Sequence, residues 1–501
     1  MSSIKKKTQV VSPPKNDSDM ARENNDMARE EILHQASPDV RTQRAYVEEH
    51  GKWSPERVAR YVKRKAKKTI DDVAMTPFLR KIAVFSSGGS FLDGYVLSLI
   101  GVALTQITPM FNLTASESAA IGASVMLGIL VGTIVGGYLT DAIGRKKMFI
   151  IDLVAIALFS ILSVFCSNPW ELVAARFFIG VFVGADYPIA TSLITEFTPK
   201  HHRAISMGMV SAAWYLGATV AALVGFCLCD VDNGWKLMLG SAIIPCVFLL
   251  IGRCKVPESP LWLKSKGREE EALKVVLRVY GDDVTLEGEE EEPKAKAGFA
   301  EVFSKGYAAR IVFLGILTLC QVVPMYAIYT FGPQIMTAFG LGVGKSAILG
   351  ESVLSLFFLV GSLPAMFWLN SMGRRPLLIR SLFLMAVGLV VLGLFPTAPL
   401  PVIICAFGLY AFFSGGPGIL QWLYPNELFP TEVRATAVGL AIGISRVGTI
   451  VATYGTPIFM AAFGIGPTML VAAGLVILGL VLSIFMAPET AGKSLGETSS
   501  L

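Results

Sequence analysis

Apolar and polar residues alternate along this chain in long blocks. From residue 82 onward, runs of about 20 apolar residues are separated by short polar breaks, and each run can cross roughly 30 Å of hydrocarbon as a helix. We therefore predict an all-α polytopic membrane protein with twelve transmembrane helices. The expected spans are 82–106, 118–138, 148–167, 171–193, 206–228, 235–253, 310–336, 346–369, 377–395, 399–424, 436–459 and 464–487.

The longest polar break between spans, 254–309, divides them into six and six. It contains KSKGREEEALKVVLRVYG, which indicates short helices, and the acidic run EGEEEE. The predicted parts are a cytoplasmic N-terminal segment (1–81), a six-helix bundle (82–253), a cytoplasmic linker (254–309), a second six-helix bundle (310–487) and a cytoplasmic tail (488–501).

The N-terminal segment is polar and begins as low-complexity sequence that is typical of disorder. Ser54 and Pro55 form a helix start, and the basic run RVARYVKRKAKK follows. Two interpretations stay open for this basic helix. It either lies on anionic cytoplasmic lipid or is a solvated segment that helps to set the topology.

Composition supports a membrane protein and argues against several other classes. The chain is 53% hydrophobic and 16% charged, whereas about a quarter of a soluble domain is charged. The seven cysteines lack the paired spacing of a disulfide framework or a zinc site. We find no nucleophile–base arrangement and no phosphate-binding loop, so we expect neither an enzyme nor a cofactor, a metal or a nucleic-acid partner.

Basic residues in the loops fix the expected orientation. The breaks after spans two, four, six, eight and ten carry Lys and Arg, whereas the alternate breaks carry almost none. Because basic loops stay in the cytoplasm, both termini are expected inside a plasma (cytoplasmic or inner) membrane.

The two halves of the chain carry the same short motifs in the same order. They recur at a nearly constant offset of 229 to 231 residues and at equivalent predicted cytoplasmic positions. This repetition indicates two homologous six-helix halves related by an axis along the membrane normal. The matching pairs are DAIGRKK (141–147) with NSMGRRP (370–376), EFTPKHHRA (196–204) with ELFPTEVRA (427–435), and PES (257–259) with PET (488–490).

These motifs resemble those of the major facilitator superfamily. GYLTDAIGRK (137–146) looks like its loop 2–3 signature, while PESPLWL (257–263), PNELFP (425–430) and PETAGKSL (488–495) resemble markers of its sugar-porter-like branch. The resemblance covers residues 82–495. It implies a monomeric secondary transporter that moves a small molecule by alternating access, with helices 1, 4, 7 and 10 lining a central cavity.

Acidic and basic residues at the predicted cytoplasmic helix ends form a candidate conformational gate. Ion pairs there can form in one conformation and break in the other. The alternative is that these residues only set topology and cap helices. The candidate gate residues are Asp141, Arg145, Glu196, Arg203, Arg374, Glu427 and Arg434.

Three ionisable residues, Asp93, Asp186 and Arg446, fall near the middle of their spans. Charges at this depth usually face a cavity and mark a substrate or ion path, and the resemblance places all three at the centre. The alternative is an Asp93–Arg446 bridge that only holds helices together. Arg176 and Glu351 lie near span ends, where we expect their side chains to reach the interface.

Each central residue suggests a chemical role. Asp93 is the expected proton carrier, with Asp186 as a second proton-coupling residue, and Arg446 offers a planar fork that matches a carboxylate or phosphate. Asp186 and Tyr187 are also expected to bind substrate, because Pro188 frees helix carbonyls beside them. Further substrate-binding candidates, each of which could instead serve packing or interface anchoring, are Tyr95, Trp214, Gln321, Tyr326, Tyr329, Gln421 and Trp422.

Comparison with related branches narrows the substrate class. The GADYP motif and the acid in helix 1 resemble proton-coupled phosphate symporters, but helix 7 has no acid and Arg446 stands where that family has Lys. Gln321 stands alone, without the glutamine pair of sugar porters. The acid in helix 1 with an arginine in helix 11 looks more like metabolite and aromatic-acid proton symporters.

The resulting hypothesis is a proton-coupled importer of a small organic anion. Its partners are the substrate, protons and the lipid bilayer. The alternatives are a proton symporter of a sugar, polyol or phosphate, and a membrane sensor that binds ligand without transporting it.

Overall fold

The computed structural model describes residues 73–281, 284, 307–429 and 431–490, and within these ranges every long element is a helix. The predicted basic helix at 54–68 and the acidic run of the linker lie outside the described residues. The first half consists of α4 (Pro77–Phe111), α5 (Ala115–Ile143), α6 (Arg145–Val164), α7 (Pro169–Phe197), α8 (Lys200–Leu228), α9 (Gly234–Gly240) and α10 (Ile243–Arg253). The linker contributes α11 (Pro260–Ser265) and α12 (Glu269–Val279). The second half consists of α14 (Ala308–Ala338), α15 (Lys345–Met372), α16 (Arg374–Leu394), α17 (Leu400–Phe413), α18 (Gly415–Leu428), α19 (Thr431–Phe463) and α20 (Ile465–Met486).

These helices form the twelve predicted spans. Ten segments are long and apolar enough to cross a membrane, and the long helices α7 and α19 complete the set. Two spans consist of two helices each, namely α9 with α10 and α17 with α18. Most helices extend a few residues beyond the apolar blocks, because backbone hydrogen bonding continues past the hydrocarbon boundary.

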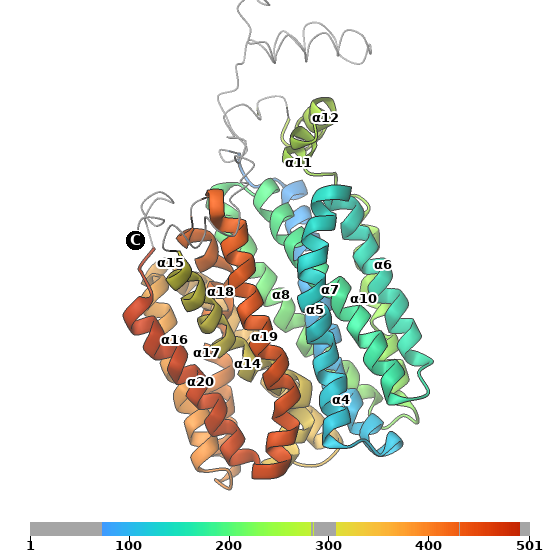
Figure 1. The fold of residues 1–501 in the computed structure, drawn as a ribbon, viewed down its shortest axis with the longest axis vertical. Helices are drawn as coiled ribbons and strands as arrows, with labels where there is room; N and C mark the ends of the chain where they lie inside the picture. The colour runs from blue at the N-terminus through green and yellow to red at the C-terminus, as the bar shows by residue number, and fades with distance from the viewer. Residues whose placement is uncertain (1–72, 282–283, 285–306, 430, 491–501) are drawn as a thin grey trace, which may run out of the picture.

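The helices stand side by side in two groups (Figure 1), with α11 and α12 at one end of the bundle. We call this the linker end and the opposite end, where α4 turns into α5 and α19 into α20, the far end. The packing partners repeat between the halves: α4 packs on α8 as α14 packs on α19. The halves meet where α8 contacts α15, where α5 contacts α19, and along α4 and α14.

Helices α5 and α7 approach so closely that their backbones touch. A Cβ atom on Gly128 or Gly132 would overlap the carbonyl oxygens of Phe177 or Val181, and one on Gly180 would overlap that of Val125. Small residues permit this approach in membranes, where helix association depends on close packing. The contact fixes the position of Asp186, one turn farther along α7.

The helix of the tenth span is broken one residue before its glycine cluster, Gly415 to Gly418. The helix is interrupted at Ser414 and resumes at Gly415. Pro417 cannot donate a backbone hydrogen bond to the preceding turn, which explains why α17 and α18 separate here.

Candidate functional site

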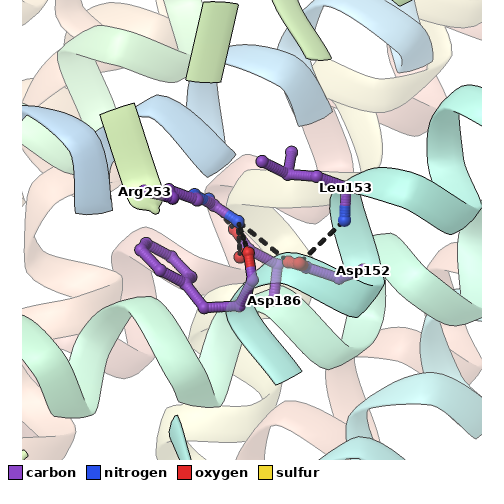
Figure 2. A network of polar contacts seen from close by, with 5 residues as sticks. Asp152, Leu153, Asp186 and Arg253 are labelled. Atoms are coloured by element: carbon purple, nitrogen blue, oxygen red, sulfur yellow. Dashed lines mark hydrogen bonds and ion pairs between the residues drawn. The ribbon is translucent and has the colours of Figure 1, made fainter. Parts of the chain in front are cut away.

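A buried ion cluster lies in the first half, toward the linker end. Arg253, the last residue of α10, places Nη1 3.0 Å from Oδ2 of Asp152 and 3.0 Å from Oδ1 of Asp186. The same nitrogen donates to the carbonyl of Phe149 at 3.0 Å, and the guanidinium lies 3.5 Å from the Phe149 ring centroid. Figure 2 shows Arg253 between the carboxylates of α6 and α7. The cluster thus ties α6, α7 and α10 together.

Asp93 lies beside this cluster on α4. A Cβ atom at Gly89, one helical turn before Asp93, would overlap Oδ2 of Asp186, so the Asp186 carboxylate lies directly against α4. Asp93 is 1% exposed, and neither of its carboxylate oxygens has a hydrogen-bond partner among the described residues. It interacts electrostatically with Asp186, Arg253 and Asp152, and also with Arg446 in the second half.

A small central cavity of about 30 Å³ lies between the two halves. Six helices contribute to its wall: α4, α7 and α8 from the first half and α14, α18 and α19 from the second. The lining residues are Ser90, Tyr187, Val210, Ser211, Trp214, Tyr215, Val322, Met325, Tyr326, Gln421, Trp422 and Arg446.

Arg446 is the charged residue of this cavity wall. Its side chain is 6% exposed, and Nη1 donates to the Tyr326 hydroxyl at 3.4 Å. The guanidinium carbon lies 5.5 Å from the ring centroid of Tyr187 and 5.8 Å from that of Tyr326. Among the described residues no carboxylate forms an ion pair with Arg446, so the alternative of an Asp93–Arg446 bridge is not realised in this structure. A buried cation held only by phenols is well suited to receive an anion.

Aromatic rings from both halves surround this guanidinium. Tyr187 of α7 and Trp422 of α18 have ring centroids 5.6 Å apart and therefore join the halves. Trp214 of α8 meets Tyr326 of α14 edge-on at 5.8 Å and 89°. Aromatic rings therefore flank the one positive charge of the cavity wall, which favours an amphipathic ligand.

The structure brings together six of the predicted substrate-binding residues and places four elsewhere. The six at the cavity are Tyr187, Trp214, Tyr326, Gln421, Trp422 and Arg446. Asp186 is instead paired with Arg253, and Tyr95 shares a hydrogen bond of 2.6 Å with Ser241. Gln321 donates to Ser414 at 3.5 Å, and Tyr329 packs between Trp214 and Phe358 at 5.0 and 5.1 Å. These four side chains face other helices. The direction in which a side chain points depends on the rotation of its helix about the helix axis, and the pattern of apolar blocks does not specify that rotation.

The carbonyl that Pro188 leaves without a helical donor belongs to Gly184. The hydroxyl of Thr133 on α5 lies 3.3 Å from this carbonyl oxygen, but it has one proton and a closer acceptor, the carbonyl of Ile129 at 2.8 Å. That this carbonyl binds a ligand therefore stays a prediction.

Sequence reasoning missed several residues of the charged cluster and the cavity. Asp152 lies inside the predicted span 148–167, and Arg253 ends the span 235–253, so a count of all charges within the spans would have found both. Ser90, Ser211 and Met325 have no comparable signal, because small and apolar residues are frequent on every helix face.

Four of the candidate gate residues form two ion pairs at the linker end. Arg145 lies 3.6 Å from Glu196, and Arg374 lies 3.1 Å from Glu427. Each pair joins helices of the same half. The side chains of the other three gate candidates, Asp141, Arg203 and Arg434, lie outside the described residues.

The glutamates of the repeated PES and PET motifs bind the starts of equivalent helices in the two halves. Glu258 accepts hydrogen bonds from the Lys146 amide at 3.1 and 3.2 Å, at the start of α6. Glu489 accepts from the amides of Arg374 and Arg375 at 3.0 Å each, at the start of α16. A carboxylate at a helix N-terminus satisfies free amides and complements the helix dipole, which explains why these motifs recur together.

Arg176 and Glu351 do not reach the interface as expected. Each is 1% exposed. Nε of Arg176 donates to the carbonyl of Ile121 at 3.1 Å, whereas both carboxylate oxygens of Glu351 lack a hydrogen-bond partner. The interface prediction fails because neighbouring helices cover both positions.

Residues 81–501 match the model of the family described as sugar (and other) transporter. The chain is 50% identical over 434 residues to the putative metabolite transport protein YaaU of Escherichia coli (strain K12), covering 87% of this chain and 97% of that protein. It is 33% identical over 422 residues to the inner membrane metabolite transport protein YgcS of the same organism, covering 84% and 94%. The proton:xylose symporter XylE has a similar fold, with a TM-score of 0.72 and 23% identity over 84% of this chain and 98% of XylE. The chain therefore belongs to the sugar (and other) transporter family, has the fold of the major facilitator transporter XylE, and is a multi-pass membrane transporter of small molecules, as the resemblance in its sequence predicted.

Proposed function

We propose that this transporter is a proton-coupled importer of a small organic anion bearing a carboxylate. The observation that carries the proposal is Arg446, a buried guanidinium in the cavity wall that has no carboxylate partner among the described residues. Burying an unpaired cation is costly, and a planar guanidinium binds a carboxylate through two parallel hydrogen bonds. The substrate carboxylate would supply the missing partner of Arg446.

The charges of the first half support proton coupling. Three carboxylates, Asp93, Asp152 and Asp186, interact with one cation, Arg253. Arg253 pairs directly with Asp152 and Asp186, whereas the oxygens of Asp93 have no partner. We therefore assign the transported proton to Asp93, and Asp186 to holding the ion cluster against α4. An entering anion adds one negative charge, and a proton on Asp93 cancels it.

Transport itself would follow from rocking of the two halves around the cavity. The linker end carries Arg145, Lys146, Arg374 and Arg375, so we place it in the cytoplasm, with both termini inside. The pairs Arg145–Glu196 and Arg374–Glu427 hold helix ends within each half and would respond when the linker end opens and closes.

The test uses proteoliposomes that contain a trapped pH-sensitive dye. Carboxylates, sugars and inorganic phosphate are added in turn, and internal acidification is recorded for the wild-type protein, Asp93→Asn and Arg446→Gln. We expect acidification by one class of carboxylate and its loss in both variants. Acidification by phosphate or by a sugar alone would overturn the substrate assignment, and specific binding without flux across the panel would favour a sensor.

An uncharged sugar or polyol is the second candidate substrate. Relatives at 27–28% identity are named as the major myo-inositol transporter IolT of Bacillus subtilis and the glucose transporter GlcP of Staphylococcus epidermidis. The cavity also offers hydroxyl and amide groups at Ser90, Ser211 and Gln421. This candidate predicts that Arg446→Gln retains transport, which separates it from the carboxylate proposal.

A further inference from the structure

Glu351 is a buried acid that the proposed transport cycle does not use. It lies on α15, seven residues from the far end of that helix, and is 1% exposed. Both carboxylate oxygens lack a hydrogen-bond partner, and none of the ion pairs of the described chain includes Glu351. An ionised carboxylate without a partner is very costly in apolar surroundings, so this site is compatible with the protonated acid.

The Glu351 side chain lies against a break in α14. Phe331 has non-helical backbone angles (φ −126°, ψ 23°), and Pro333 follows two residues later. A Cβ atom on the intervening Gly332 would lie 2.6 Å from Cδ of Glu351. Because Pro333 has no amide hydrogen, the carbonyl of Tyr329 loses its helical donor, and α14 can bend here.

The opposite side of the same break contacts the first half of the protein. A Cβ atom on Gly101 of α4 would lie 2.7 Å from the Tyr329 carbonyl oxygen. A Cβ atom on Gly122 of α5 would lie 2.8 Å from Cγ2 of Thr330 and 3.0 Å from Cζ of Phe331. The broken part of α14 is thus held between α4 and α5 on one side and Glu351 on the other.

Two further contacts between the halves show that the far end is closed in this structure. Lys345 of α15 pairs with Asp230, which follows α8, at 2.5 Å. Ser116 of α5 and Tyr454 of α19 share a hydrogen bond of 2.8 Å. Glu351 is therefore sealed behind α14 while the far end is closed.

We propose that Glu351 is a second proton-binding group of this transporter, and that its protonation stabilises the conformation in which the far end is closed around α14. When α14 moves away from α4 and α5, water reaches Glu351 and the acid ionises. When α14 returns, the carboxyl group must hold a proton before it can be buried. A proton taken up at the far end therefore drives closure, by the linkage between ionisation and conformation.

The groups that face Glu351 are compatible with this role. The titratable side chain with which it interacts on α14 is Tyr329, and Tyr329 interacts in turn with Tyr215 of α8 and Tyr410 of α17. These phenols are neutral over the physiological pH range, with reference pKa values of about 10. Of these groups, the carboxyl group of Glu351 is thus the one that can change charge without ionising a phenol.

The test measures the distance between the two halves at the far end. Spin labels are placed by Ser167→Cys in the loop before α7 and Thr397→Cys in the loop before α17, in a protein whose native cysteines are replaced. Double electron–electron resonance in nanodiscs then gives the populations of short and long distances from pH 5 to pH 8. We expect the ratio of closed to open far end to fall with rising pH by up to about tenfold per pH unit, the limit for one proton.

Two variants at Glu351 decide the outcome. Glu351→Gln resembles the protonated acid and is expected to keep the far end closed at every pH, whereas Glu351→Asp is expected to retain the pH response. An unchanged pH response in Glu351→Gln would overturn the proposal, as would a distance ratio that does not vary with pH in the wild-type protein. If the Gln variant does not fold, the midpoint of the pH response in the Asp variant decides, because displacing the carboxyl group should shift this midpoint and an unchanged midpoint would overturn the proposal.

The proposal rests on the proton coupling proposed above but can fail separately from it. Asp93→Asn removes the proposed transport proton and is expected to leave the pH response of the far-end distance in place. A different substrate class would alter the uptake panel and not this distance measurement.

Discussion

Arg253 and Asp186 form an ion pair of 3.0 Å that is wholly enclosed within the first half of the transporter. The pair joins the linker end of α10 to the centre of α7, and Asp152 of α6 shares the same guanidinium nitrogen at 3.0 Å. Because the Asp186 carboxylate also lies against Gly89 on α4, the pair links three helices to the one that carries Asp93. This relationship makes Asp186 part of the support of the proposed proton site.

Loss of Arg253 should destabilise the protein strongly. Arg253→Met leaves two buried carboxylates facing each other without a cation, and breaking a buried pair in this way costs about 3–5 kcal/mol. We expect a lower Tm in detergent by thermal unfolding. The matched control is the triple variant Arg253→Met with Asp152→Asn and Asp186→Asn, which removes every charge and should recover most of the loss. A wild-type Tm in the single variant would contradict this account of the cluster.

Asp93→Asn should separate substrate binding from proton movement. The amide cannot exchange a proton, whereas the substrate contact at Arg446 remains. We expect proton-driven accumulation to fall at least about tenfold, while exchange of labelled for unlabelled substrate across the membrane continues. Asp93→Glu, which keeps the titratable group, is the control and should retain part of the accumulation. Full accumulation by the Asn variant would remove Asp93 from the coupling mechanism.

Arg446 variants should change substrate affinity in a graded way. Arg446→Gln removes the cation and should weaken the Kd of a carboxylate substrate by the equivalent of about 2–5 kcal/mol. Arg446→Lys keeps the charge but loses the planar fork, so a smaller loss is expected. Quenching of Trp214 and Trp422 fluorescence reports binding, since both rings line the cavity. Tyr326→Phe, which removes one hydrogen bond to the guanidinium, should have the smallest effect. An affinity equal to that of the wild-type protein in all three variants would show that the substrate does not contact Arg446.

The Lys345–Asp230 pair should influence the far end without setting its pH response. The hydrogen bond from Lys345 lowers the pKa of the Asp230 carboxyl below its usual value of 3.8. Because the pKa is lowered, the pair stabilises the structure fully at pH values above the ordinary carboxyl pKa. This stabilisation is lost only when the pH falls through the lowered pKa. The pair is therefore intact between pH 5 and 8.

We expect Asp230→Asn to increase the open population at the far end, in the distance measurement described for Glu351, by a factor that is the same at every pH in this range. A change in the midpoint of the pH response in this variant would show that Asp230 is itself part of the proton sensor.

The sequence alone determined the membrane class, the twelve spans and the two halves. Each of these follows from local properties: a run of about 20 apolar residues is a span wherever it occurs, and repeated motifs such as PES and PET mark equivalent positions. The midspan charges Asp93, Asp186 and Arg446 could likewise be found from position alone. Orientation in the membrane stays a prediction from the basic loops.

Only the tertiary structure decided which of these residues meet. Asp186 pairs with Arg253 rather than facing the cavity, Arg446 meets phenols rather than Asp93, and Glu351 is enclosed behind α14 instead of reaching the interface. The physical reason is that hydropathy fixes the depth of a residue in the membrane, whereas its partner depends on helix rotation and on contacts between helices far apart in the chain. In lipid those contacts are set by close packing of small residues and by polar groups that must find a partner, and neither is visible in one span at a time.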